Sequence, residues 1–207
     1  MSGSNGYAAL VKQRTSGKTK RRRLDDYETP NNVTRALVRH YLGPSFQRPI
    51  VKGPILEPAC GSGRMVRELR TELECKVFGF DIKKGYDFFK RRGVWKGDTV
   101  TNPPYRDGLA ERFVRHALKI TNGRVCMLLQ SGFLWGGKRG SGLYSECPPE
   151  CVLILPERIY FYEDGRPIKS QFFNHAWVCW PTRMVRQRGE YDTKTIWVGP
   201  EDEDFVG

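Results

Sequence analysis

Apolar and polar positions follow two different periods along the first 130 residues of the chain. Short apolar runs predict buried strands at residues 54–57, 76–80, 99–101 and 124–129. Apolar side chains that recur at every third or fourth position predict helices at residues 32–42, 65–73 and 109–120. Strands that alternate with helices predict an α/β fold with a mostly parallel central sheet and helices on both of its faces.

The pattern changes after residue 129. Residues 130–149 are rich in glycine and carry aromatic and basic side chains, which predicts an irregular loop. Apolar runs at residues 151–155 and 172–180 predict two further strands. No helical pattern separates these two runs, so we expect them to form an antiparallel pair of C-terminal strands.

Length and composition indicate one globular domain. The chain has 207 residues, which favours a single well-buried core. It contains no apolar run of about 18 residues and its N-terminus is polar and basic, so we expect a cytosolic (cytoplasmic) protein without a transmembrane helix or secretory signal. Its six cysteines show no CxxC spacing, so we expect reduced thiols and no metal site.

The net charge of +12 is unevenly distributed. Residues 1–23 contain seven lysines and arginines, no acidic residue, and many serines, glycines and threonines, a composition typical of a mobile arm. Such an arm binds a polyanion or only keeps the chain soluble. We favour nucleic acid, because an enzyme for a small neutral substrate gains little from the arm. We therefore divide the chain into a basic arm at 1–23, a globular domain at 24–183 and a C-terminal extension with an acidic end at 184–207.

A glycine-rich turn follows the first predicted strand. It reads Glu57-Pro58-Ala59-Cys60-Gly61-Ser62-Gly63, and its glycines allow the backbone to pass close to a ligand at the carboxyl end of the strand. Asp81 ends the next predicted strand, where a carboxylate can accept both ribose hydroxyls of a nucleoside. No lysine follows the glycines, so the pattern fits S-adenosylmethionine and not a phosphate-binding loop. A purely structural turn is the alternative.

Asn102-Pro103-Pro104-Tyr105 follows the third predicted strand. Neither proline has an N–H to donate to the sheet, so the strand ends there and carbonyl groups point outward. The Asn102 side-chain oxygen and backbone carbonyls can accept N–H bonds from a planar amine, and the Tyr105 ring can stack on it. A tight Pro-Pro turn after a core strand is the alternative.

Together the two segments resemble the motifs of class I S-adenosylmethionine-dependent amino-methyltransferases, in the small, phage-like DNA adenine-N6 form without a target-recognition domain. The resemblance covers about residues 26–180. It implies a Rossmann-like class I methyltransferase fold. It also implies cofactor contacts at the matching positions, which are Thr29, Pro30, Glu57, Ala59, Gly61, Gly63, Asp81, Asp87 and Phe88.

Within this set, the resemblance implies that Asp81 holds the ribose and that Asp87 meets the adenine amine. Asp87 lies only six residues after Asp81, where the family usually has a helix and a strand, so we expect a shorter chain at this point. A helix cap is the alternative role of Asp87.

The resemblance further implies catalysis by Asn102, Pro103, Pro104 and Tyr105. The Asn102 oxygen and the Pro103 carbonyl would accept two N–H bonds from the target amine and favour its pyramidal, nucleophilic form. Tyr105 would stack on the base and hold the nitrogen in line with the methyl group. Transfer would then be a single displacement without a covalent intermediate.

Two downstream segments are candidates for substrate contact. Residues 156–161 and 172–177 resemble the late motif of the DNA adenine enzymes, in which an aromatic ring closes over a flipped base. Phe161 is our candidate for this ring and Tyr160 is the second choice, whereas we expect His175 to be a structural strand residue. Lys138 and Arg139 in the 130–149 loop would hold the nucleic-acid strand; a surface loop with a buried aromatic anchor is the alternative.

We therefore expect an S-adenosylmethionine-dependent DNA adenine-N6 methyltransferase that acts on double-stranded DNA and binds neither a metal nor a membrane. No insertion is large enough for a separate target-recognition domain, which predicts short or relaxed sequence specificity. Methylation of adenine in RNA or of glutamine in a protein is the first alternative. A non-catalytic nucleic-acid-binding protein with the same fold is the second. The recognition site and the oligomeric state stay open.

Overall fold

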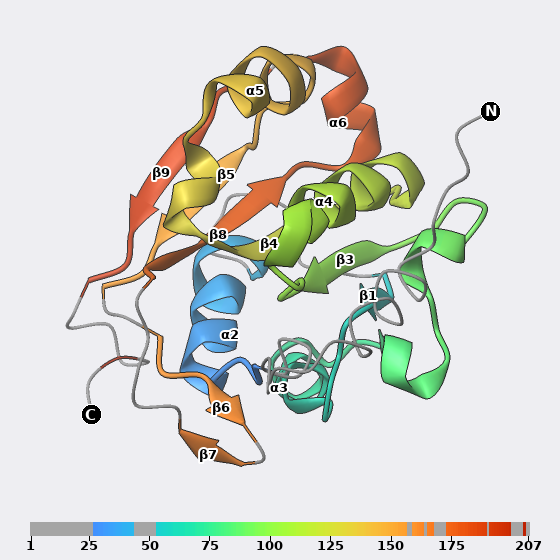
Figure 1. Ribbon diagram of the computed structural model, residues 1–207, viewed down its shortest axis with the longest axis vertical. Coiled ribbons are helices and arrows are strands. Elements are labelled where there is room, and N and C mark those ends of the chain that lie inside the picture. Colours follow the sequence, from blue (N-terminus) through green and yellow to red (C-terminus); the bar gives the residue numbers. More distant parts are fainter. Residues whose placement is uncertain are drawn as a thin grey trace, which may run out of the picture.

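The computed structural model describes residues 27–43, 53–156, 159–163, 165–167, 173–189, 191–199 and 205. The predicted basic arm at residues 1–23 lies outside these described residues. Within them, the chain forms a seven-stranded sheet with the strand order β2-β1-β3-β4-β8-β5-β9 and a separate hairpin of β6 and β7 (Figure 1).

Most strands of the large sheet are parallel. The strands are β1 (Ile55–Glu57), β2 (Val77–Gly79), β3 (Asp98–Thr101), β4 (Val125–Gln130), β5 (Cys151–Ile154), β8 (His175–Trp180) and β9 (Lys194–Trp197), and the hairpin consists of β6 (Tyr162–Glu163) and β7 (Arg166–Pro167). The strands β2, β1, β3 and β4 pair in parallel, whereas β8 runs antiparallel to both of its neighbours, β4 and β5. The predicted mostly parallel sheet and the antiparallel pairing of the two late strands are confirmed.

Strand β9 was not predicted. It pairs in parallel with β5 at the edge of the sheet, and α6 (Arg183–Arg188) connects it to β8. Strand β9 and all of α6 except its first residue lie within residues 184–207, which we expected to form a C-terminal extension. Three of the four residues of β9 are exposed, so its sequence lacks the apolar run by which the other strands were identified.

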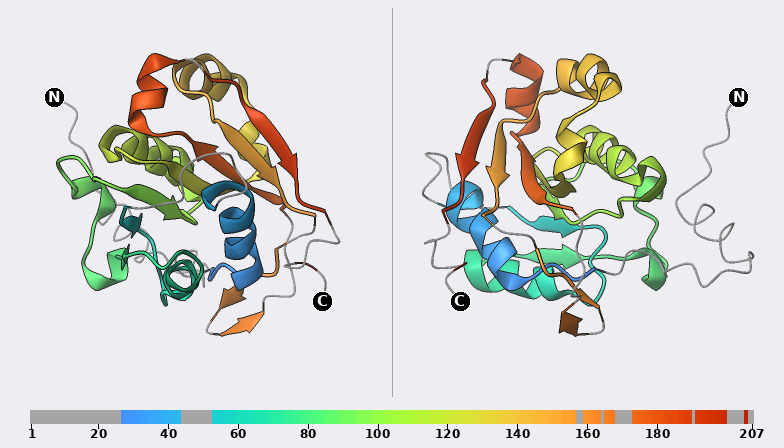
Figure 2. Two further views of the ribbon diagram at one scale, coloured as in Figure 1. Left: turned by 180° about the vertical axis from the view of Figure 1, so that it is seen from behind. Right: turned by 60° about the vertical axis from the view of Figure 1, so that its left-hand side comes forward.

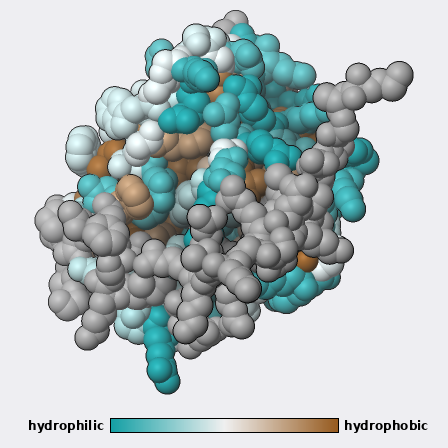
Figure 3. Space-filling model, in the orientation of Figure 1, coloured by the Kyte–Doolittle hydropathy of each residue, from teal (hydrophilic) through white to brown (hydrophobic). Residues whose placement is uncertain are grey.

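Helices cover both faces of the sheet. One face is covered by α2 (Asn31–Leu37), its π-helical continuation η1 (Val38–Leu42) and α3 (Arg64–Leu73), and the other face by α4 (Leu109–Ile120) (Figure 2). Alternate residues of a strand point to opposite faces, so Leu128 of β4 joins one core cluster and Met127 joins the other. The buried hydrophobic residues thus lie between layers, and the face drawn in Figure 3 shows both hydrophilic and hydrophobic residues.

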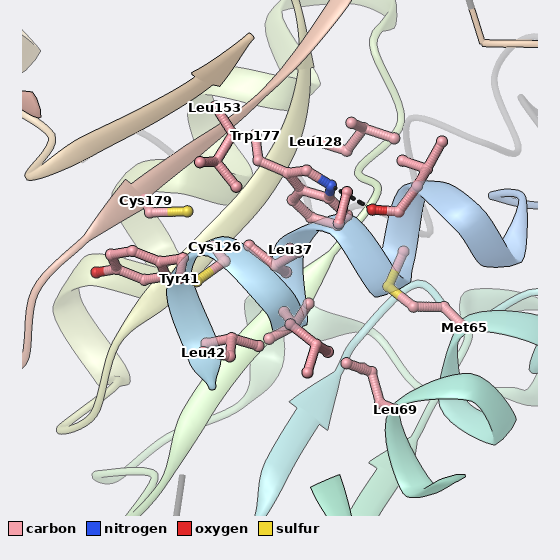
Figure 4. Close-up of a cluster of buried hydrophobic side chains, with 14 of the residues drawn as sticks. Leu37, Tyr41, Leu42, Met65, Leu69, Cys126, Leu128, Leu153, Trp177 and Cys179 are labelled. Carbon is pink, nitrogen blue, oxygen red and sulfur yellow. Dashed lines mark hydrogen bonds between the residues drawn. The ribbon is translucent and has the colours of Figure 1, made fainter. Parts of the chain in front are cut away.

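The first core cluster joins α2 and α3 to the sheet (Figure 4). Leu37 and Tyr41 from the α2–η1 segment, Leu69 from α3 and Trp177 from β8 are fully buried. Trp177 donates its indole N–H to the Val33 carbonyl at 2.8 Å, which satisfies a buried polar group. This bond joins the first turn of α2 to β8.

Residues 130–149 are helical for much of their length, so the prediction of an irregular loop is wrong. The segment contains the 3-10 turn η6 (Ser131–Leu134), the short helix α5 (Gly137–Arg139) and the π-helical turn η7 (Gly140–Tyr144). Phe133 and Leu143 are buried in the second core cluster. Their packing outweighs the low helix propensity of the glycines around them.

The link between Asp81 and Asp87 is short, as predicted. It contains only the 3-10 turn η3 (Ile82–Lys84), and a second turn, η4 (Phe88–Lys90), follows it. The chain then returns to β3 on the other side of β1. With no further strand inserted here, β2 forms one edge of the described sheet.

Candidate active site

The two predicted motifs lie next to each other at the carboxyl ends of β1 and β3. The chain passes from β1 to β2 on one side and then returns to β3 on the other, so the strand order reverses between β1 and β3. Open α/β sheets bind ligands at such a reversal point. Glu57 ends β1 and Thr101 ends β3, and the Thr101 hydroxyl donates to Glu57 Oε1 at 2.5 Å. The structure therefore brings the glycine turn and the Asn-Pro-Pro-Tyr segment together.

Glu57 is a buried carboxyl group at the base of the glycine turn. Only 1% of the residue is exposed, and its Oε1 also accepts the N–H of Ala59 at 2.9 Å. Burial raises the pKa of Glu57 to about 8, and the hydrogen bonds from Thr101 and Ala59 oppose that rise only in part. A cation bound beside Glu57 would therefore stabilise its ionised form.

Asp81 supports the glycine turn. Gly61 and Gly63 adopt positive φ angles of 51° and 87°, which glycine tolerates without strain. The Gly61 N–H donates to Asp81 Oδ2 at 2.9 Å, and the Lys83 N–H donates to Oδ1 at 2.8 Å. Because a carboxylate has about four lone-pair sites, Asp81 keeps acceptor capacity for a ligand. A Cβ at Gly61 would meet no atom within 4 Å, so the turn borders open space.

Asp87 and Phe88 have different surroundings. Asp87 Oδ1 accepts the Phe89 N–H at 3.0 Å and caps η4, so the alternative role of a helix cap is present. Phe88 is fully buried, and its ring centroid lies 5.1 Å from that of Phe113 and 4.7 Å from that of His116. Phe88 is therefore a core residue in this structure, and its ring offers no surface to a cofactor. Of these two residues, only Asp87 stays a candidate for contact with the cofactor.

Asn102 lies at the centre of a hydrogen-bond network. Its Nδ2 donates to the Tyr27 carbonyl at 3.2 Å, and its Oδ1 accepts a hydrogen bond from the Tyr105 hydroxyl. The same hydroxyl also lies within 3.1 Å of the Leu128 carbonyl. Tyr105 thus points back toward Asn102. The oxygen that we predicted to accept the target amine is occupied by this neighbouring side chain, and both prolines between them are buried.

Aromatic rings enclose the network around Asn102. The centroid of the Phe161 ring lies 5.9 Å from that of Tyr27 and 5.0 Å from that of His175. His175 in turn lies 5.4 Å from the ring of Tyr105. Phe161 is only 1% exposed, whereas Tyr160 is 55% exposed. Phe161, our first candidate for the ring that closes over a base, is thus a buried wall residue here, and Tyr160 offers the accessible ring.

His175 is the first residue of β8, in agreement with its predicted place in a strand. It is 4% exposed, and neither ring nitrogen has a hydrogen-bond partner among the described residues. The backbone of Phe173 approaches the ring without hydrogen-bond geometry. Burial lowers the pKa of His175 to about 4, so the ring is neutral at physiological pH. A neutral imidazole keeps one donor and one acceptor.

Arg139 is held within its own turn. Its guanidinium donates to the carbonyls of Phe133 at 2.7 Å, Gly132 at 3.2 Å and Trp135. These bonds satisfy the backbone of η6, so the arginine does not face outward as a substrate contact would. The adjacent Lys138 is exposed, and Trp135 is 73% exposed. Of the predicted basic pair, Lys138 is the one available to a ligand.

Two residues of the site were missed by sequence reasoning, Tyr27 and Arg64. Tyr27 contributes its backbone carbonyl to Asn102, and every residue type has that group. Arg64 begins α3 directly after the glycine turn and lies over the Tyr162 ring, 4.1 Å from its centroid. Neither contact leaves a signal in the chain, because each depends on a segment that is distant in sequence.

Across the described ranges, no group of three or more histidine, cysteine or acidic side chains is arranged to hold a metal ion. No helix in the described part of the chain combines the length and apolar character needed to cross a bilayer.

The chain is similar in fold to solved structures that include two proteins named as methyltransferases and one restriction endonuclease. The methyltransferase subunit of a type I restriction-modification system from Streptococcus thermophilus matches with a TM-score of 0.54 and 14% identity, over 91% of this chain and 50% of that chain. A protein assigned as an RNA methyltransferase from Pyrococcus horikoshii matches with a TM-score of 0.51 and 13% identity, over 85% of this chain and 98% of that chain. The type IIG restriction endonuclease BpuSI matches with a TM-score of 0.54 and 13% identity, over 84% of this chain and 27% of that chain.

These matches define the fold and not the activity, because the identities are low. The chain spans about half the length of the Streptococcus protein and about a quarter of BpuSI. No protein-family model matches the sequence, and no curated protein matches it. Together with the strand order, the structural matches show that the chain has the Rossmann-like α/β fold of class I methyltransferases.

Proposed function

We propose that the protein is an S-adenosylmethionine-dependent DNA methyltransferase that transfers a methyl group to the N6 amine of adenine. One observation carries the proposal. Asn102 and the residues after it lie beside the glycine turn, whose Gly61 N–H is bound by Asp81, at the point where the strand order of the sheet reverses. A cofactor at the turn and a planar amine at Asn102 would meet at this edge.

The cofactor side of the site fits S-adenosylmethionine by its chemistry. Asp81 would accept the ribose hydroxyls and Asp87 the adenine amine, while the open space beside Gly61 admits a ligand close to the backbone. Glu57 would be stabilised as a carboxylate by the ammonium group of the methionine moiety. Thr29, buried just before α2, is the candidate for the carboxylate of that moiety. The cofactor, when bound, supplies an electrophilic methyl group on a sulfonium centre.

The catalytic side would act on the amine nitrogen. The Asn102 Oδ1 and the Pro103 carbonyl would accept its two N–H bonds and localise its lone pair. The Tyr105 hydroxyl donates a hydrogen bond to Asn102 Oδ1 in this structure. This hydrogen bond has to break when the amine of the substrate binds to the same oxygen. Its ring is then available to stack on the base. The proton released after transfer can leave to solvent.

DNA is the preferred substrate for two reasons. The chain carries a net charge of +12, which favours a polyanion over a protein glutamine. Two of the structural matches are, by name, a restriction-modification methyltransferase subunit and a restriction endonuclease. A base in a duplex has to be flipped out to reach Asn102, and the accessible Tyr160 and Lys138 are candidates to hold it. We further propose short or relaxed sequence specificity.

Adenine in RNA is the second candidate substrate. The protein assigned as an RNA methyltransferase is matched over 98% of its own length, so this chain contains a counterpart of nearly all of its fold. The charge of the chain suits RNA as well as DNA.

Labelled S-adenosylmethionine offered with duplex DNA, RNA and protein tests the proposal directly. Wild-type protein is compared with Asn102→Ala, which removes the proposed acceptor. Asn122→Ala, which makes the same substitution at an exposed asparagine outside the site, is the control. We expect label on adenine N6 of DNA with the wild type and the control, and a rate at least about 100-fold lower with Asn102→Ala.

The alternatives give distinct results. Label on RNA alone would replace DNA by the second candidate. No transfer to any substrate, with the cofactor still bound, would favour a non-catalytic nucleic-acid-binding protein. Equal rates for Asn102→Ala and the wild type would rule out the proposed role of Asn102.

A further inference from the structure

Residues 27–30 form a strap that lies across the carboxyl edge of the sheet before α2 begins. The peptide unit between Tyr27 and Glu28 has two partners: its carbonyl accepts Asn102 Nδ2 at 3.2 Å, and its N–H donates to the Tyr162 carbonyl at 2.9 Å. A peptide group is planar and rigid, so its carbonyl and N–H keep a fixed relation. The pairing with Tyr162 therefore sets the direction of the carbonyl that holds Asn102.

The Arg64 side chain contacts both residues of this pairing, Glu28 and Tyr162. Its Nε lies 3.4 Å from Glu28 Oε2, and its guanidinium lies over the Tyr162 ring, 4.1 Å from the centroid. Tyr162 also donates its own N–H to the Glu28 carbonyl at 3.1 Å. One arginine thus contacts both partners of the pairing that orients the Tyr27–Glu28 peptide. The same arginine directly follows Gly63 of the glycine turn.

The direction of the Asn102 amide matters for the chemistry. A side-chain amide has a donor end and an acceptor end. Because the Tyr27 carbonyl can only accept, the NH2 end of Asn102 faces the strap and the oxygen faces the other way, where the Tyr105 hydroxyl now lies. A flipped amide would present N–H groups to an incoming amine that also has to donate. It could not accept the bonds that make the amine nucleophilic.

We propose that Glu28 and Arg64 are positioning residues for Asn102. They hold the strap so that the Tyr27 carbonyl keeps the oxygen of the Asn102 amide toward the substrate. This inference rests on the proposed function, because it assigns that oxygen to the target amine. It also makes an arginine at the cofactor turn part of the apparatus that orients the catalytic amide.

Side-chain amide signals of asparagine, observed by NMR after 15N labelling, test the positioning without any catalysis. The Asn102 signal is the one that disappears in Asn102→Ala. In Arg64→Ala and Glu28→Gln we expect its amide protons to exchange with water about tenfold faster, because the hydrogen bond to the Tyr27 carbonyl would be weakened by about 1.4 kcal/mol. Arg64→Lys keeps the charge and should restore part of the protection. Arg115→Ala, which breaks an exposed arginine–glutamate pair of 3.0 Å on α4, should leave the signal unchanged.

A kinetic measurement separates positioning from a structural effect on the cofactor turn. With the substrate that accepts methyl groups, we expect kcat of Arg64→Ala to fall about tenfold while the KM for the cofactor changes less than about twofold. Damage to the glycine turn would instead raise that KM. Thermal unfolding checks that each variant is folded, and the milder Glu28→Gln replaces Arg64→Ala if the latter does not fold.

The results separate this inference from the proposed function. Unchanged exchange at Asn102 in the folded variants would overturn the positioning role, whatever the rate does. Accelerated exchange at Asn102 supports it. If that acceleration is seen but the wild type transfers methyl groups to no substrate, the strap still orients Asn102 and the proposed function is the part that fails.

Discussion

The amide of Asn102 is held from two sides, and this makes its chemistry specific. Its Nδ2 faces the Tyr27 carbonyl at 3.2 Å, and its Oδ1 receives the Tyr105 hydroxyl. Asn102→Asp would place a carboxylate oxygen against the Tyr27 carbonyl, where neither atom has a hydrogen to share. We expect the methyl-transfer rate to fall about 100-fold or more, because the repulsion moves the side chain from its acceptor position. Single-turnover rates measure this, and a rate near that of the wild type would contradict it.

The proposed function gives the Tyr105 hydroxyl and the Tyr105 ring separate roles. Tyr105→Phe removes the hydroxyl that occupies Asn102 Oδ1 but keeps the ring. We expect the transfer rate to stay within about threefold of the wild type, while stability falls by about 1 kcal/mol through the lost hydrogen bond. Tyr105→Ala removes the ring as well and should lower the rate about 100-fold. Equal losses in both variants would show that the hydroxyl, and not the ring, is required.

Glu57 gives the protein a defined dependence of stability on pH. Burial raises its pKa from 4.5 to about 8. A raised carboxyl pKa means that the folded state holds the proton more tightly, so this stabilisation is complete below pH 4.5 and is lost as the pH rises through 8. Glu57→Gln cannot ionise and should lack this loss. We expect its free energy of unfolding to match the wild type near pH 4 and to exceed it by up to about 5 kcal/mol above pH 8.

Denaturant titrations across this pH range measure the difference between Glu57→Gln and the wild type. A constant difference at all pH values would show that Glu57 keeps its ordinary pKa. Addition of S-adenosylmethionine should reduce the difference, because its ammonium group would favour the ionised carboxylate of the wild type.

The contact between β1 and β3 depends on a glycine. A Cβ at Gly97 would lie 1.9 Å from the Pro54 carbonyl oxygen, which also accepts the Asp98 N–H at 3.0 Å. Gly97→Ala therefore has to push apart the amino ends of β1 and β3, and we expect it to lower the free energy of unfolding by more than about 3 kcal/mol. Gly132→Ala is the matched control, since a Cβ there would meet no atom within 4 Å. Similar denaturation midpoints for the two variants would refute this close approach.

Elements with a strong local pattern were predicted well. Helix α4 covers Leu109–Ile120, as its apolar spacing indicated, and its inward face is buried against the sheet. Two kinds of element were not. Strand β9 is exposed at three of four positions, so it depends on pairing with β5. The helical turns of residues 130–149 depend on the burial of Phe133 and Leu143. The many glycines in this segment do not indicate a helix.

The charge of the whole molecule predicts its response to salt. Residues 1–23, outside the described part of the chain, contribute seven basic side chains to the net charge of +12. Removing them should weaken DNA binding and reduce the slope of log K against log salt by up to about 6, because each neutralised phosphate adds about 0.9. A variant with the seven residues changed to glutamine keeps the length and should behave in the same way. An unchanged slope in both would exclude contact between this arm and DNA.

The sheet, the glycine turn, Asp81 and the Asn-Pro-Pro-Tyr segment were recognisable in the chain because each is a pattern among near neighbours. The groups that surround these motifs could not be recognised in the chain. The burial and the direction of each side chain depend on segments that are far apart in sequence. Tyr27 is 75 residues from Asn102 and contributes only a carbonyl. Phe88 and Phe161 lose their exposed surface only when distant elements pack around them. Local sequence therefore indicated which chemical groups gather at the candidate site, and tertiary packing decided which of them are buried and which contact one another.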